Sequence, residues 1–113
     1  MDGDALPLPR LQGVYVLRMF GAECFFAPNG RMFAFLDDDR LFLRLPGPEY
    51  ESLLAAGGDP FMLRPGVPFG RWASLPRGLQ RDAVAALAEA AYRAALAEGA
   101  SPRRARRRRR GLQ

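Results

Sequence analysis

The chain of 113 residues has no histidine, no lysine and a single cysteine, and these absences exclude several chemistries. Histidine is the commonest general base and metal ligand, so neither a Ser–His nor a Cys–His nucleophile pair can form. One cysteine without histidine cannot build an internal disulfide or an ordinary structural zinc site. The phosphate-binding spacings GxGxxG and GxxxxGK[ST] do not occur either. We therefore expect no enzymatic activity, no cofactor and no bound metal.

Two features could carry chemistry, but each has a simpler interpretation. Cys24 lies in an apolar run beside Phe25, where a cysteine behaves as a small buried apolar residue. A reactive thiol would need exposure and cationic neighbours. The acidic run 37–39 could offer oxygens to a hard cation, but it lacks the spaced ligands of a calcium loop. We expect a buried thiol and a solvated turn.

The chain also lacks long apolar stretches and a basic N-terminus. No run of residues approaches the roughly 20 apolar positions that a membrane-spanning helix needs. The first residues, Met1 to Asp4, are acidic where a signal peptide would be basic. The single cysteine is typical of a reducing compartment. These observations predict a cytoplasmic protein with no membrane partner.

The net charge of +5 is unevenly distributed. Seven of the 17 arginines gather near the C-terminus, and the rest of the chain has ten arginines against twelve acidic residues, a net charge of −2. The clustered residues are Arg103, Arg104, Arg106, Arg107, Arg108, Arg109 and Arg110. Arginine binds phosphate bidentately, so this cluster predicts non-specific contact with nucleic acid. The alternative is a solvated tail, enriched in arginine because the coding sequence is GC-rich.

Apolar runs separated by turn residues predict a sheet in the first half of the chain. The expected strands are 14–17, 24–27, 32–36 and 41–45, followed by two short ones at 61–64 and 67–72. In 41–45, Leu41, Leu43 and Leu45 share one face, which indicates a sheet with one buried side. Pro68 indicates that the last strand lies at an edge of the sheet.

Two helices are predicted after the first four strands. A short one spans 49–56 and ends at two glycines. A long one spans about 82–98, with Asp82 as its N-cap and an apolar side that includes Val84, Leu87, Ala91 and Leu96. Together these elements predict an α+β fold in two layers. Its antiparallel sheet has about five to six strands, and the short helix and the long C-terminal helix pack on it.

The aromatic residues have two interpretations. Eight phenylalanines, three tyrosines and one tryptophan could form a stacking platform for single-stranded nucleic acid. Most of them alternate within predicted strands, however, and no strand mixes arginine, glycine and aromatics in the manner of an RNA-binding sheet. We therefore expect most of the aromatic rings to be core residues. Trp72 lies near a predicted edge, so for this ring both interpretations stay open.

Several spaced motifs resemble the N-terminal domain of the TfoX/Sxy family, which is named for regulating competence for DNA uptake in bacteria. They are the opening Arg18-Met19-Phe20-Gly21, the turn and strand Asn29-Gly30-Arg31-Met32-Phe33-Ala34, the strand 39–44, Asp59-Pro60-Phe61, and the segment from Trp72 through Pro76 into the alanine-rich helix. The resemblance covers about three-quarters of the chain. It implies a two-layer α+β domain, no known enzymatic activity, and a structural role for the matching motif residues.

The resemblance also shapes the expected organisation and partners. We expect a flexible lead at 1–10, a TfoX N-terminal-like domain at 11–98 and a disordered arginine-rich tail at 99–113. Full-length family members act with a transcription activator, so a regulatory protein-interaction module is the leading hypothesis; nucleic-acid binding through the tail is the alternative. Family members usually have a helix before the first strand, which Pro7 and Pro9 disfavour here. An uncovered part of the sheet would then predict a homodimer.

Overall fold

The computed structural model describes residues 10–100, which form a six-stranded antiparallel sheet and two helices. The elements in chain order are β1 (Tyr15–Met19), β2 (Ala22–Phe26), β3 (Met32–Asp37), β4 (Arg40–Arg44), α1 (Gly47–Ala55), β5 (Asp59–Arg64), β6 (Val67–Ser74) and α2 (Arg81–Ala97). The predicted α+β fold is confirmed, with the short helix and the long C-terminal helix that the sequence indicated.

The strands do not follow one another across the whole sheet. Their spatial order is β1-β2-β3-β4-β6-β5, so β6 lies between β4 and the outer strand β5. The edge position expected for β6 is therefore wrong. The residues paired with β4 are Trp72, Ala73 and Ser74, at the end of β6, whereas Pro68 lies in the first half and faces Met62 of β5. The missing N–H of Pro68 thus costs no pairing with β4.

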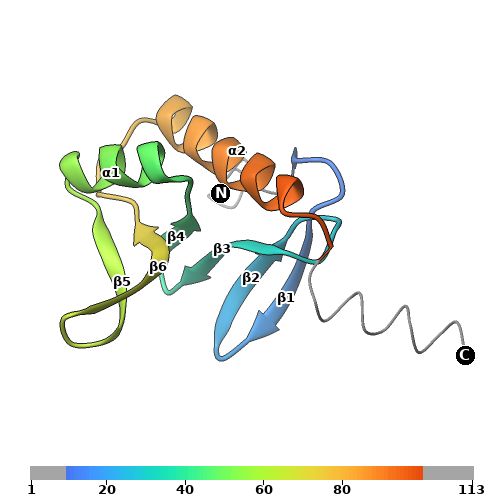
Figure 1. The fold of residues 1–113 in the computed structure, drawn as a ribbon, viewed down its shortest axis with the longest axis horizontal. Helices are drawn as coiled ribbons and strands as arrows, with labels where there is room; N and C mark the ends of the chain where they lie inside the picture. Colours follow the sequence, from blue (N-terminus) through green and yellow to red (C-terminus); the bar gives the residue numbers. More distant parts are fainter. Residues whose placement is uncertain (1–9, 101–113) are drawn as a thin grey trace, which may run out of the picture.

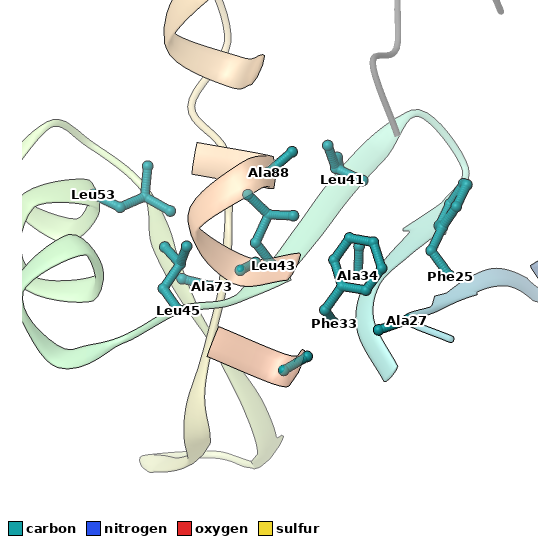
Figure 2. Packing of buried hydrophobic residues seen from close by; sticks show 12 residues of the cluster. Phe25, Ala27, Phe33, Ala34, Leu41, Leu43, Leu45, Leu53, Ala73 and Ala88 are labelled. Atoms are coloured by element: carbon teal, nitrogen blue, oxygen red, sulfur yellow. The ribbon is translucent and has the colours of Figure 1, made fainter. Parts of the chain in front are cut away.

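Both helices lie on the same face of the sheet, and the main core fills the space between them and the strands (Figure 1). α2 packs on β3 and β4, and α1 packs on β6. Leu41, Leu43 and Leu45 all belong to this core, as their alternation predicted, and Figure 2 shows them between the helices and the sheet. The layer is built of leucine, phenylalanine and alanine side chains that lose nearly all contact with water.

The opposite face of the sheet carries a second, aromatic cluster. Phe35 of β3 stacks on Phe42 of β4 with a centroid distance of 4.6 Å, and Phe61 of β5 meets both rings edge to face. Trp72 packs against Phe35 at 5.3 Å. Phe42 and Trp72 are buried, so the core interpretation holds for both rings, including Trp72, which the sequence left open. The expectation of one buried side is wrong, because both faces of the sheet carry buried residues. Rings that pack on one another in this way stabilise the sheet and do not leave a flat stacking platform.

α1 meets β6 through a close contact at a glycine. The helix begins at Gly47, with a proline in its first turn, and ends at Ala55. A Cβ atom on Gly58 would lie 2.7 Å from the carbonyl oxygen of Ser74 and 2.8 Å from Cγ of Leu53. Because only glycine leaves room here, the chain can turn directly from α1 into β5 against the buried end of β6.

α2 differs from its predicted form at both ends. Its N-cap residue is Gln80, which makes no side-chain capping bond, and Asp82 lies in the first turn instead. A carboxylate there still interacts favourably with the helix dipole. Leu96 is exposed, and the buried residues of the helix are Ala88, Ala91 and Ala95. These small side chains let α2 approach the sheet closely, and the stripe they form does not include Leu96.

The C-terminal end of α2 is capped by the turn between β2 and β3. The side-chain amide of Asn29 donates hydrogen bonds to the carbonyl oxygens of Ala95 and Gly99, both at 2.8 Å. Arg31 donates to the Gly99 carbonyl and pairs with Glu98 at 3.4 Å. The last carbonyls of a helix have no partner within it, so this turn satisfies groups that would otherwise need water.

Replacing Asn29 with alanine is expected to lower the free energy of unfolding by about 1–2 kcal/mol, because two hydrogen bonds to the end of α2 are lost. Urea unfolding followed by circular dichroism measures this change. Gln80→Ala is the matched control at the other end of the helix, where the capping side chain makes no hydrogen bond. Equal destabilisation by both variants would contradict the capping role of Asn29.

Candidate interaction surfaces

The first family-like motif forms the tip of the β1–β2 hairpin. Arg18 and Met19 end β1, and Phe20 and Gly21 form the two-residue turn with φ angles of 54° and 78°. Positive φ at both central residues fits a type I′ turn. Phe20 is 98% exposed, although left-handed backbone is unfavourable for a phenylalanine. The fold therefore holds a large apolar ring in water in an uncommon conformation.

The other motif residues are spread over the domain and are not gathered at one site. Gly30 belongs to the turn that caps α2, and Met32 is half-buried at the start of β3. Phe33 is completely buried and meets Tyr92 of α2 edge to face at 5.7 Å.

Pro60 and Phe61 belong to β5, and Pro76 follows β6. Phe61 is a member of the aromatic cluster, whereas Pro76 lines a cavity beyond the end of β6. Turn geometry and packing therefore account for much of the family-like pattern.

Four exposed apolar residues mark the first edge of the sheet, and we call them the β1 surface. They are Tyr15, Val16, Leu17 and Phe20. Val16 and Leu17 are 46% and 49% exposed although they point to opposite faces of the strand. β1 is thus uncovered on both faces within the described residues, and the hairpin that carries it projects away from the helices (Figure 1).

A second set of exposed apolar residues lies at the other end of the sheet, and we call it the hairpin surface. It consists of Met62, Leu63, Val67 and Phe69 on the β5–β6 hairpin. Leu63 is 64% exposed, and Phe69 contacts the aromatic cluster through Phe61 at a centroid distance of 6.3 Å. This hairpin also projects away from the helices, on the side opposite to the β1–β2 hairpin (Figure 1). Exposed Arg64 and Arg71 flank it.

A cavity of about 700 Å³ opens beside the start of β4 and beyond the end of β6, next to the start of α2. Its lining combines apolar Leu41, Leu79 and Val84 with charged residues that include Arg40 and Asp59. These two charges already satisfy each other, because the Arg40 guanidinium contacts Asp59 at 3.3 Å and donates to the buried Ser74 hydroxyl at 2.6 Å. The charged groups at this position therefore stabilise the end of the sheet.

The remaining residues with chemical potential are placed as the sequence indicated. Cys24 is buried in β2, and burial raises the pKa of its thiol, an effect that a backbone hydrogen bond from Met19 partly offsets. Burial therefore favours the neutral thiol over the reactive thiolate. The acidic run 37–39 forms an exposed turn between β3 and β4, where Asp38 has a φ of 57°.

The seven clustered arginines, 103–110, lie outside the described residues, as do most of the predicted lead and tail. Within residues 10–100, no three or more acidic or cysteine side chains gather closely enough to hold a metal ion. In the same part of the chain, neither helix has the length and apolar character needed to cross a membrane.

The fold and its surfaces define a small two-layer α+β domain with apolar side chains exposed at both ends of its sheet. Residues 8–95 match the family model of the TfoX N-terminal domain. Because this match spans most of the chain, the protein belongs to the TfoX N-terminal domain family, and the resemblance seen in the motifs is confirmed. Comparisons with curated proteins and with solved structures give no match.

Sequence patterns predict that part of the sheet is uncovered, but they do not locate the two exposed surfaces. The run Val14 to Leu17 has no polar alternation, which is typical of a strand buried on both faces. The same is true of the apolar residues on either side of Pro65-Gly66. One pattern could have indicated these surfaces. The strands have more continuous apolar residues than two helices are able to cover, so some of these residues must be exposed.

Proposed function

We propose that this TfoX N-terminal domain is a non-catalytic protein-interaction module that acts in transcription regulation, and that it binds its protein partner through the hairpin surface. The observation that supports the proposal is the exposure of four large apolar side chains on one hairpin. Large apolar side chains that gather in water on one part of a soluble protein commonly mark protein–protein contacts. The family membership supports a regulatory role in the cytoplasm, including a role in competence.

The charges around the hairpin surface specify the chemistry of the partner. Arg64 and Arg71 are both exposed, and no acidic residue occurs between positions 60 and 73. Arg71 is also anchored, because its Nε donates a 2.7 Å hydrogen bond to the carbonyl oxygen of Leu45. A fixed cation beside apolar side chains favours a partner segment that combines apolar and acidic residues.

The outer strand favours contact through side chains over the addition of a further strand. β5 contains Pro60, and its pairing with β6 has register shifts between Pro60 and Met62 and between Met62 and Arg64. Prolines and bulges of this kind interrupt the row of backbone groups that a new strand would need. The partner would therefore dock on Leu63 and its apolar neighbours.

The proposal predicts that Leu63→Ser weakens partner binding by about tenfold or more, because a central apolar contact is lost. The partner is captured from a bacterial lysate with the full chain, identified by mass spectrometry, purified, and titrated calorimetrically against each variant. Leu96→Ser is the matched control, since Leu96 is an exposed leucine in the last turn of α2 and does not belong to the hairpin.

Two results would contradict this function. One is a captured partner whose affinity is the same for Leu63→Ser and for the unmodified chain. The other is loss of every captured partner when residues 101–113 are removed, since contact would then depend on the tail and not on the folded domain.

A second candidate function is non-specific binding of nucleic acid through the arginine tail, and the concentration of seven arginines in eight residues favours it. Such a segment contacts phosphates and carries no base-reading information. The two functions are compatible, because the domain and the tail would bind different partners.

A further inference from the structure

β1 is a regular, exposed edge strand in the described part of the chain. It pairs only with β2, through a continuous register from Tyr15–Phe26 to Met19–Ala22. It contains no proline and no bulge, in contrast to the irregular strand β5 at the other edge. A regular, exposed strand at a sheet edge is a template for a further strand.

The turn type determines which backbone groups of β1 face outward. In a two-residue hairpin the residues that flank the turn, here Met19 and Ala22, exchange backbone hydrogen bonds. The hydrogen-bonded positions alternate along the strand, so Leu17 also points its N–H and C=O groups toward β2. Val16 and Arg18 then direct their N–H and C=O groups away from the sheet, toward an incoming strand.

We propose that two copies of this chain associate by antiparallel pairing of β1 with β1, with a two-fold axis at Leu17. The partner on this surface is thus a second copy, and the two six-stranded sheets join into one. This inference goes beyond the proposed function because it uses the opposite end of the sheet from the hairpin surface.

Repulsion between like charges excludes one of the registers that bring outward-facing groups together. A pairing centred on Arg18 would place two guanidinium groups directly opposite each other, which is destabilising. A pairing centred on Leu17 places Arg18 opposite Val16 of the second copy. Within its own sheet Arg18 pairs with Glu23, and the negative charge of Glu23 offsets the positive charge of Arg18.

The same register uses the whole strand and matches its side chains. It sets Tyr15 opposite Met19 of the second copy, a favourable pairing of an aromatic ring with a thioether. It sets Leu17 against Leu17, so a half-exposed apolar residue gains an apolar neighbour. The exposed Phe20 belongs to the turn and lies just beyond the paired residues.

The dimer is expected to be weak because the contact is short. A five-residue strand spans only about 17 Å. Such a contact lies at the low end of specific interfaces, so we expect a dissociation constant on the order of 10–100 μM.

Sedimentation velocity of the full chain from about 5 to about 500 μM would therefore show a shift from monomer to dimer, as this expected affinity requires. A monomer at every concentration overturns the proposal. Pairing of β1 with residues 1–9 of the same chain would give this result.

Substitutions at the two-fold axis test the pairing itself. Leu17→Arg places two cations opposite each other and is expected to give a monomer, and Leu17→Glu does the same with two anions. An equimolar mixture of these two variants is expected to restore the dimer, because the opposite charges then face each other. Both substitutions are at an exposed position, and thermal melts monitored by circular dichroism check that each variant is folded.

The control is Leu63→Arg, an equivalent change at the other edge of the sheet, which is expected to leave the dimer intact. A dimer that persists in both Leu17 variants overturns the proposal. So does a mixture of the two variants that stays monomeric. Neither result depends on partner binding by the hairpin surface, so this proposal and the proposed function can fail separately.

Discussion

Replacing Phe33 with alanine is expected to lower the free energy of unfolding by about 3–5 kcal/mol, the usual cost of removing a buried phenylalanine ring. Phe33 has no exposed surface and lies between β3 and α2, where its ring meets Tyr92. The surrounding alanines are too small to fill the cavity that the substitution leaves. Figure 2 shows Phe33 beside Ala27 and Ala34 in this part of the core.

The loss is large compared with the total stability of a small domain, which is about 5–15 kcal/mol. Because Phe33 supports α2, we also expect the helical signal to unfold at a lower urea concentration than in the unmodified chain. Phe20→Ala is the matched control, since that ring is 98% exposed and its removal is expected to change stability by less than about 0.5 kcal/mol. A loss below about 1 kcal/mol for Phe33→Ala would contradict the packing of α2 on β3.

Local sequence patterns were sufficient to predict the elements of this fold. The strand at 41–45 has strict alternation, and its three leucines do face the helices. The turn at Asn29-Gly30 and the acidic turn at 37–39 lie between strands, as predicted, because these residues tolerate positive φ. Two glycines end α1 close to the expected position. In each case the deciding forces act between residues close together in the chain.

The order of the strands depends on forces that local patterns do not report. Pro68 was interpreted as the mark of an edge strand, but β6 pairs with β4 through Trp72, Ala73 and Ser74 only. One half of β6 is interior and the other half has a single neighbour. A proline can occupy the N-terminal half, which has β5 as its single neighbour, without loss of pairing to β4. The sequence does not reveal where this half of β6 ends and the interior half begins.

The candidate surfaces could not be predicted for a related reason. Val16 and Leu17 have the composition of buried residues, and their exposure follows from where the helices pack. α2 packs mainly on β3 and β4. Likewise, Asn29 caps Ala95 across 66 positions of sequence. Such contacts follow from the tertiary arrangement and not from the local residue pattern.

Replacing the seven clustered arginines, 103–110, with glutamine is expected to abolish binding to DNA. The unmodified chain has a net charge of +5, and without these arginines it has ten arginines against twelve acidic residues, a net charge of −2. The variant would therefore be weakly repelled by a polyanion. The change leaves the domain at residues 10–100 intact, so circular dichroism of the folded domain is expected to stay the same.

The salt dependence of binding distinguishes the tail from an adventitious contact. Seven arginines that each neutralise one phosphate would give a slope of log affinity against log salt of roughly −5 to −6, from about 0.7–0.9 per contact. Fluorescence anisotropy with a labelled duplex, repeated with a second duplex of unrelated sequence, measures the slope and the expected indifference to sequence. No affinity at low salt, or affinity unchanged in the glutamine variant, would rule out the tail as a nucleic-acid contact. A strong preference for one duplex would instead require base contacts, which an arginine cluster alone does not provide.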